Sequence, residues 1–196
     1  MLKERQDKLN KLLPKNGKML DMGCARGQVS QYIIQEWASY YGVEYNEAMI
    51  AECREKWLQV TFCDLNTWKL PFEDDSFDVV YASHVLEHFY IEKQIDILLE
   101  CSRILKKGGK ILFYMPTWYH WSFFDDETHR RWHSHISLSA LAKDTGFIVD
   151  ECRYSLTRKF SDKMQWYFRI PPHPWYLTEV YIVATNDKKK FFSKEY

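Results

Sequence analysis

The sequence predicts an α/β fold in which helices cover both faces of a seven-stranded, mostly parallel sheet whose last strand is antiparallel. Two observations support this prediction. Short apolar runs alternate with amphipathic helical patterns along most of the chain, as in repeated βαβ units. Glycine is sparse, seven in 196 residues, and each glycine falls where one pattern gives way to the next. The chain length fits a single domain spanning 1–196.

The expected elements follow in order along the chain. Four leucines between residues 2 and 13 lie on a charged background and predict a helix within 1–16, which Pro14 would end. Strands are expected at 18–22, 40–44, 59–63, 77–82, 110–115, 147–154 and 177–184. Helices are expected at 27–37, 46–57, 92–105 and 137–144. Two segments, 116–136 and 160–175, are expected as inserts on the substrate side of the sheet.

Composition limits the classes of function. The 27 basic and 27 acidic side chains give a formal net charge of zero, so a nucleic-acid partner is not expected. The polar N-terminus and the absence of an apolar run of about 18 residues predict a cytoplasmic chain without a transmembrane segment. The five cysteines never form a C-x-x-C pair, which favours reduced thiols over a disulfide framework or a zinc site.

A glycine loop follows the first expected strand. Gly23-x-x-x-Gly27 comes directly after Asp21 and opens a helix, so backbone N–H groups would face a ligand. The dinucleotide-binding pattern requires glycines where this chain has Ala25 and Gln28. The loop therefore fits a pyrophosphate poorly, although a nucleoside-containing cofactor is expected.

Acidic residues at the ends of the next two strands support such a cofactor. The second strand ends in Glu44, where a carboxylate can accept hydrogen bonds from ribose hydroxyls. Asp64 follows the third strand and can accept from an adenine amino group. Taken together with the loop, these residues favour a nucleoside bound across the carboxyl ends of the first three strands.

Six motifs lie in order along residues 18–150: Met19-Leu20-Asp21-Met22-Gly23-Cys24-Ala25-Arg26-Gly27, Cys63-Asp64-Leu65, Leu70-Pro71-Phe72-Glu73-Asp74-Asp75-Ser76-Phe77-Asp78, Val79-Val80-Tyr81-Ala82-Ser83-His84-Val85-Leu86-Glu87-His88, Ile104-Leu105-Lys106-Lys107-Gly108-Gly109 and Thr145-Gly146-Phe147. In order and spacing they resemble the motifs of class I S-adenosylmethionine-dependent methyltransferases of the small-molecule, type 11-like branch. The resemblance implies a Rossmann-like fold, a transferase activity and S-adenosyl-L-methionine as cofactor.

The resemblance also implies roles for particular residues. The loop would hold the methionine part of the cofactor, Glu44 the ribose, and Asp64 with Leu65 the adenine. The full cofactor-binding set that it implies is Asp21, Gly23, Cys24, Gly27, Glu44, Tyr45, Asp64, Leu65 and Ser83. Ala25 departs from the family, which usually has glycine there, and this departure puts the loop conformation and the cofactor affinity in doubt.

Histidines are the candidates for acid–base chemistry. His84 follows the fourth strand at its carboxyl end, where open α/β sheets bind ligands, and is a candidate catalytic base together with His129. His88, Arg130 and Arg131 are candidate substrate-binding residues. His84 and His88 could instead have packing or helix-orienting roles. Residues 126–131 could instead form a solvated charged loop. No metal site is expected.

The segments 126–131 and 137–141 resemble the substrate-facing insert of methyltransferases in bacterial surface-glycan pathways. The expected function is therefore methyl transfer to a small molecule, with a hydroxyl of a sugar or surface-glycan precursor as the first choice. A quinone-type or lipophilic acceptor is the alternative, suggested by Trp166-Tyr167-Phe168. An NAD-dependent oxidoreductase and a non-catalytic cofactor-binding protein are the rival classes, and the oligomeric state is left open.

Overall fold

The computed structural model describes residues 2–30, 39–67, 69–117, 126–156 and 177–188. Their elements alternate between strands and helices as the sequence pattern predicts. In chain order these are α1 (Leu2–Leu12), β1 (Lys18–Met22), β2 (Ser39–Glu44), α3 (Glu47–Glu55), β3 (Val60–Phe62), β4 (Phe77–Ser83), the 3-10 helix η1 (Leu86–His88), α4 (Ile91–Ile104), β5 (Leu105–Pro116), α6 (His135–Asp144), β6 (Phe147–Leu156) and β7 (Leu177–Asn186).

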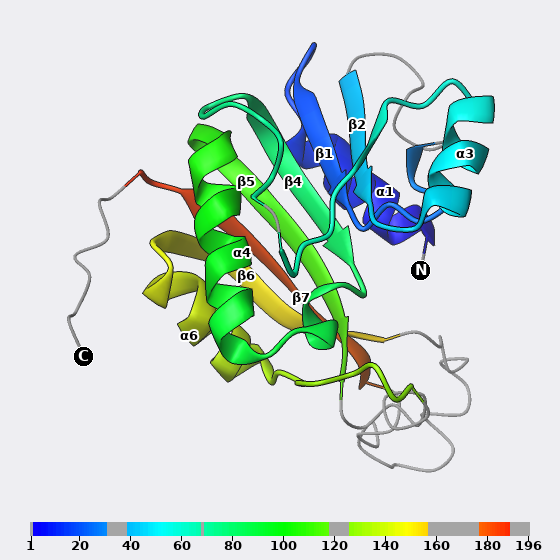
Figure 1. Ribbon diagram of the computed structural model, residues 1–196. Coiled ribbons are helices and arrows are strands. Elements are labelled where there is room, and N and C mark those ends of the chain that lie inside the picture. The colour runs from blue at the N-terminus through cyan, green and yellow to red at the C-terminus, as the bar shows by residue number, and fades with distance from the viewer. Residues whose placement is uncertain (1, 31–38, 68, 118–125, 157–176, 189–196) are drawn as a thin grey trace, which may run out of the picture.

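The strands form one seven-stranded sheet in the order β3-β2-β1-β4-β5-β7-β6 (Figure 1). Strands β1 to β5 pair in parallel, whereas β7 is antiparallel to both of its neighbours. The fold class and the antiparallel last strand are thereby confirmed. Strand order reverses between β1 and β4, and open α/β sheets bind ligands beyond the carboxyl ends of the strands at such a reversal.

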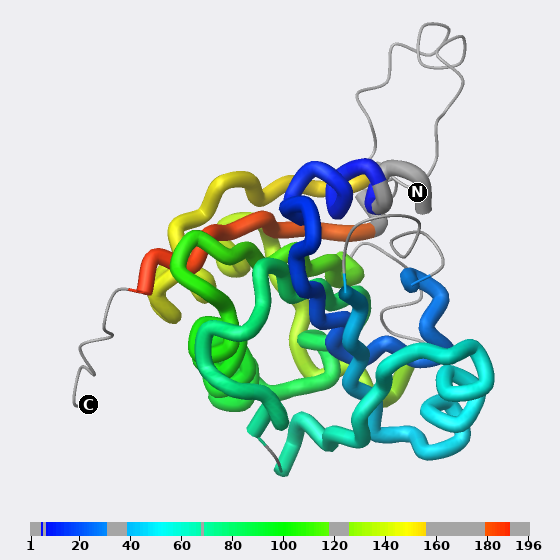
Figure 2. Tube along the Cα trace, turned by 90° about the horizontal axis from the view of Figure 1, so that it is seen from above, coloured from blue at the N-terminus to red at the C-terminus, as the bar shows by residue number. Residues whose placement is uncertain are grey.

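Alternate residues of the central strands enter two separate cores, because successive side chains of a strand point to opposite faces. Val80 and Ala82 of β4 join the core covered by α4 and α6, whereas Val79 and Tyr81 join the core that contains Leu9 of α1 and Ile50 of α3. Figures 1 and 2 show α4 and α1 on opposite sides of the sheet. Strands buried on both faces explain the nearly continuous apolar runs in the sequence.

The element bounds differ little from the predicted ones, and the largest shift has a local cause. Strand β5 begins at Leu105, which pairs with Phe77, before the ladder breaks and resumes at the pair Lys110 and Val79. The break coincides with Gly108, whose φ of +81° is in the left-handed region that favours glycine. Most of the helix expected at 27–37 lies in 31–38, which is outside the described residues. The insert expected at 160–175 lies entirely outside them.

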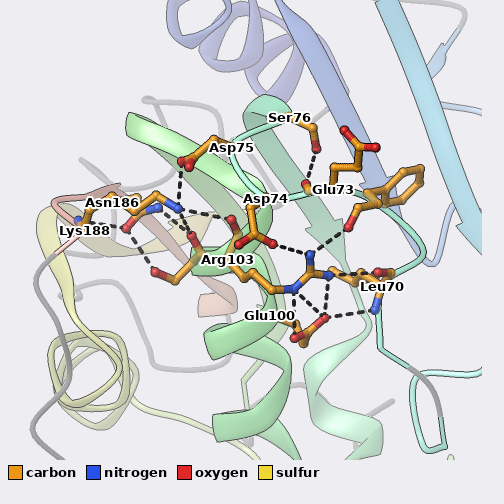
Figure 3. Close-up of polar contacts among 11 residues, drawn as sticks. Leu70, Glu73, Asp74, Asp75, Ser76, Glu100, Arg103, Asn186 and Lys188 are labelled. Atoms are coloured by element: carbon orange, nitrogen blue, oxygen red, sulfur yellow. Dashed lines mark hydrogen bonds and ion pairs between the residues drawn. The ribbon is translucent and has the colours of Figure 1, made fainter.

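The loop before β4 is held by Arg103 of α4 (Figure 3). Its guanidinium donates to the backbone oxygens of Leu70 and Phe72 and pairs with the carboxylates of Asp74 and Glu100. This planar, multidentate group closes the loop against the helix. The stretch 70–78 that contributes to the family resemblance therefore has a structural role.

No helix among the described residues is long and apolar enough to cross a membrane.

Candidate functional site

The candidate site begins where β1 and β4 end side by side. Met22 pairs with Ala82, so the loop after β1 starts next to Ser83. Gly23 has a φ of +69°, and a Cβ built on it would lie 2.6 Å from a methyl carbon of Val85. The glycine therefore allows the two loops to pack directly on each other.

Ala25 in the same loop adopts a φ of +47°. An L-residue with a side chain pays roughly 1–2 kcal/mol for left-handed backbone. Its N–H nevertheless donates to a carboxylate oxygen of Glu44 at 3.0 Å. The departure from the family pattern is accommodated by backbone strain and by this contact.

Glu44 at the end of β2 accepts more hydrogen bonds than any other residue of the expected cofactor set in the described part of the chain. Its side chain is buried among backbone donors: one oxygen accepts from the N–H groups of Tyr45 and Asn46, each at 3.0 Å, and the other accepts from Ala25. A carboxylate has about four acceptor positions, so roughly one acceptor position remains for a ligand hydroxyl. The same side chain thus fixes the glycine loop against the start of α3.

Asp21 lies under the loop and does not face solvent. It is 2% exposed and accepts a hydrogen bond of 2.8 Å from the hydroxyl of Tyr40. Burial raises the pKa of this carboxyl to about 7, against the lowering effect of the tyrosine hydrogen bond. Cys24 is also buried, and burial raises the pKa of its thiol, which makes the thiol unreactive.

The remaining residues of the expected cofactor set have different surroundings. Asp64 is partly exposed and accepts from the N–H of Asn66, while the ring of Tyr45 is 68% exposed at the end of β2. Leu65 packs partly against the core. The hydroxyl of Ser83 instead accepts a 2.7 Å hydrogen bond from Arg5 of α1.

His84 lies next to the loop, with both ring nitrogens near carboxylates. Its Nε2 is 2.7 Å from an oxygen of Glu179 on β7, and its Nδ1 is 3.5 Å from Glu87. Arg5 pairs with the same Glu179 and covers the ring of Tyr114. His84 also has a left-handed φ of +57°, so its backbone is strained.

Glu87 is the most deeply buried acidic group of the site. It is 0% exposed, and neither carboxylate oxygen has a hydrogen-bond partner among the residues that the structure describes. Burial raises its pKa to about 7 despite the nearby imidazole of His84. The backbone oxygen of Glu87, in contrast, accepts from the N–H groups of Arg130 and Arg131 at 2.7 and 3.1 Å.

These backbone contacts bring residues 126–131, which belong to the expected insert 116–136, onto η1. His129 lies with its Nε2 4.0 Å from Glu87 and its ring centroid 4.9 Å from that of His88. The pKa of His88 is lowered, first by burial and then by the charge of His129. The side chains of Arg130 and Arg131 are exposed beside this cluster.

His129 and His133, four residues apart, have unrelated environments. His133 is 1% exposed, and its Nε2 is 2.8 Å from the side-chain oxygen of Gln94. The amide nitrogen of Gln94 donates to the backbone oxygens of Leu86 and Phe89, which fixes the amide orientation. The proton of His133 is therefore on Nε2, and this histidine anchors the segment to the residues around η1.

The structure thus gathers two groups of expected residues. Asp21, Gly23, Gly27 and Glu44 surround the glycine loop, and His84, His88 and His129 lie around Glu87. Arg5 and Glu179 were not predicted, because they come from the two ends of the chain and no local pattern marks them. The residues 118–125 of the first insert lie outside the described part of the chain.

Residues 20–113 match the family model described as a methyltransferase domain. The chain is 29% identical over 137 residues to a protein of Mycolicibacterium smegmatis described as a probable S-adenosylmethionine-dependent methyltransferase, covering 68% of this chain and 52% of the relative. It is 36% identical over 110 residues to a sterol 4-C-methyltransferase of Caenorhabditis elegans, covering 52% of this chain and 32% of the relative. The chain therefore spans about half the length, or less, of these relatives.

Among solved structures, the fold is similar to that of an S-adenosylmethionine-dependent methyltransferase from Archaeoglobus fulgidus. The TM-score is 0.74 at 21% identity, and the match covers 94% of each chain. It is also similar to a protein from Pyrococcus horikoshii, with a TM-score of 0.70 at 20% identity over 94% of this chain and 88% of the other. Both likenesses confirm the expected Rossmann-like architecture.

Proposed function

Because the chain belongs to the class I S-adenosylmethionine-dependent methyltransferases, we propose that it transfers the methyl group of this cofactor to a hydroxyl of a small-molecule acceptor, with a sugar or surface-glycan precursor as first choice. The observation that supports a hydroxyl acceptor is the group of His84, Glu87 and Glu179 directly beside the glycine loop. A hydroxyl needs a base to become a good nucleophile, and this group supplies one.

The cofactor-side residues fit a nucleoside bound through methionine, ribose and adenine. S-adenosylmethionine supplies an electrophilic methyl group, so the protein has to orient the reactants and remove a proton. Glu44 retains about one acceptor position for a ribose hydroxyl. The exposed ring of Tyr45 and the carboxylate of Asp64 flank the position expected for the adenine ring. The remaining residues of the expected set, including Cys24, Leu65 and Ser83, would shape the walls.

His84 is the better of the two candidate bases. If its Nε2–H donates to Glu179, as the 2.7 Å contact allows, the lone pair on Nδ1 accepts the proton. Glu87, 3.5 Å from Nδ1, then stabilises the imidazolium. In the proposed step the acceptor oxygen loses its proton to His84 and forms a bond to the methyl carbon, while the carbon–sulfur bond of the sulfonium breaks.

Two exposed arginines indicate the character of the acceptor. Arg130 and Arg131 are held at the cluster by their backbone contacts to Glu87, which leaves their guanidinium groups at the surface. Guanidinium groups bind phosphate and carboxylate in a bidentate manner. We therefore favour an anionic acceptor, such as a sugar nucleotide or an acidic glycan, for which His88 would be a further contact.

The proposal is tested with methyl-labelled S-adenosylmethionine and two acceptor panels. One panel contains sugar nucleotides and acidic oligosaccharides, and the other contains quinols and sterols, since one relative acts on a sterol. Label in the saccharide panel is the expected result. Transfer confined to the lipophilic panel would overturn the acceptor class, and cofactor binding without transfer to either panel or to a cell extract would favour a non-catalytic protein.

The role of His84 is tested by His84→Asn and His84→Ala. Asparagine tolerates the left-handed backbone at this position better than alanine does, so the first variant separates chemistry from strain. Both variants are expected to lower the rate of methyl transfer by about 100-fold or more while changing cofactor affinity by less than about threefold. An unchanged rate in His84→Asn would remove His84 as the base.

A further inference from the structure

A second feature of the site is a cluster of three potential metal ligands, one of which, Glu87, also lies near His84. Of the residues that the structure describes, Glu87, His88 and His129 are the group of three whose potential ligand atoms all lie within 4.8 Å of one another. One is a carboxylate and two are imidazoles, supplied by η1 and by the segment docked on it. Such a set is the ligand chemistry of catalytic zinc and related transition-metal sites.

The state of Glu87 is the independent observation that points to a ligand. A buried carboxylate that makes no hydrogen bond costs several kcal/mol in desolvation (roughly 2–7 kcal/mol for a polar group, more for a charge). Both oxygens of Glu87 are in this position within the described part of the chain, and the side chain is 0% exposed. A cation placed between Glu87 and the two histidines would offset this cost.

A second contact network prepares His88 as a ligand. The hydroxyl of Thr128 donates to Asp126, so its oxygen accepts from Nδ1 of His88 at 2.8 Å. The proton of His88 is then on Nδ1, and its Nε2 carries the lone pair that a metal needs. Metal-binding histidines commonly donate their other N–H to an oxygen in this way, which fixes the tautomer.

We propose that Glu87, His88 and His129 form a binding site for a divalent transition-metal cation. Imidazole nitrogens favour zinc, cobalt, nickel and iron over magnesium, which prefers oxygen ligands. Tetrahedral zinc with bonds of about 2.0–2.1 Å separates its ligand atoms by about 3.4 Å. The cluster, now within 4.8 Å, has to contract by up to about 1.4 Å, a movement that side-chain rotation provides.

With three protein ligands, a tetrahedral ion keeps one position open. An acceptor hydroxyl bound there would be acidified, as water is on zinc, and His84 lies close enough to Glu87 to take the proton. This catalytic role rests on the proposed function, whereas the binding of the ion does not. His129, a candidate base from the sequence, becomes a ligand in this arrangement.

The test is binding of zinc and cobalt to the full 196-residue chain after treatment with a chelator. Calorimetry with Zn²⁺ is expected to give one ion per chain, and Mg²⁺ is expected to bind far more weakly. The visible spectrum with Co²⁺ is expected to show a site of nitrogen and oxygen ligands. A thiolate-to-cobalt charge-transfer band would assign the ion to one of the five cysteines and overturn the proposal.

Glu87→Gln and His129→Asn are expected to weaken zinc binding by at least about tenfold. The matched control is His135→Asn, which removes an exposed histidine at the start of α6, outside the cluster, and is expected to leave zinc affinity unchanged. Each variant is also titrated with S-adenosylmethionine, because normal cofactor binding shows that it is folded. Zinc affinity unaffected by Glu87→Gln and His129→Asn, or lost equally in the control, would overturn the site.

The two proposals fail separately. Zinc binding is measured without any acceptor, so a chain that binds zinc through these residues but transfers no methyl group would contradict only the proposed function. A chain that transfers the methyl group at the same rate with and without chelator, and binds no zinc, would contradict only the metal site.

Discussion

Two buried glutamates at the same edge of the sheet differ in how their charges are satisfied. Glu44 is 6% exposed, and its carboxylate accepts hydrogen bonds from three backbone N–H groups. Glu87 is 0% exposed, and in the described part of the chain its carboxylate accepts none. The side chain of Glu44 therefore stabilises its own loop. Glu87 is held in place through its backbone oxygen, and its carboxylate oxygens can bind a ligand or a proton.

This difference separates a structural requirement from a functional one. Neighbouring backbone stabilises Glu44 whether or not a cofactor is bound, so its presence helps the fold as well as the site. Glu87 costs stability where it lies, and uncompensated buried polar groups of this kind are typical of binding and catalytic centres. The same substitution at the two positions should therefore change stability in opposite directions.

The largest effect is expected for Glu44→Gln. Its amide nitrogen must face one of the backbone donors, which leaves at least one buried N–H unpaired at a cost of about 1–3 kcal/mol. We expect the free energy of unfolding to fall by about 2 kcal/mol and S-adenosylmethionine affinity to fall by at least about tenfold. Denaturant unfolding and calorimetry measure the two quantities.

Glu55→Gln is the matched control, since Glu55 lies exposed at the end of α3, the helix that follows Glu44. It should change neither quantity. Equal losses in both variants would mean that net charge, and not the three hydrogen bonds of Glu44, determines the effect.

A pH-dependent effect of similar size is expected at His133, which anchors the segment carrying His129. Burial lowers its pKa to about 4, whereas an unfolded histidine titrates near about 6.5. Between these values the unfolded chain binds more protons, so the stability that neutral His133 provides is present at neutral pH and lost as the pH falls toward about 4.

The measurement compares the wild type with His133→Gln, which removes the titrating group. The stability advantage of the wild type over the variant should shrink by about 2 kcal/mol between about pH 7 and pH 4.5. His135→Gln serves as the control because its side chain is exposed. A difference that is constant with pH would show that His133 is not kept neutral by burial.

Glu87→Gln is expected to give a smaller change with the opposite sign. In the presence of a chelator and at about pH 8, the neutral amide replaces a buried carboxylate that makes no hydrogen bond, so unfolding should become about 1 kcal/mol less favourable. Cofactor affinity should change by less than about threefold, because Glu87 lies on the acceptor side. A loss of stability as large as that of Glu44→Gln would mean that Glu87 has partners and would remove the contrast between the two residues.

Most of the fold could be predicted because its signals are local. Strand β1 was predicted with its observed bounds, since its four buried residues directly follow an exposed lysine and a turn. Helix α6 begins at His135, two residues before its predicted start, because Ser134 and Ser137 form a reciprocal capping pair three residues apart. Where the turn at Gly108 interrupts β5 and shifts its register against β4, the sequence predicted only the later piece of the strand.

The candidate site was only half predictable. The glycine loop and Glu44 lie within one βαβ unit, so their spacing is readable from the sequence. The ion pair of Arg5 with Glu179 joins residues 174 positions apart, and no local pattern encodes such a contact. For the same reason the sequence offered His129 and His88 only as separate candidates, whereas the fold brings His129 to Glu87 and His88.

The smallest effect is expected at Ala25, on the Glu44 side of the comparison. Ala25 adopts a φ of +47° and donates to Glu44, and we expect the loop to keep this conformation when the cofactor binds. Glycine would relieve about 1–2 kcal/mol of strain but would lose about 0.5–1 kcal/mol through the greater freedom of the unfolded chain. We expect Ala25→Gly to raise the free energy of unfolding by less than about 1 kcal/mol and to leave S-adenosylmethionine affinity within about threefold of the wild type. Affinity that rises by tenfold or more, measured by calorimetry, would mean that the loop has to move on binding, and Glu44 would then hold a strained free state in place of a preformed one.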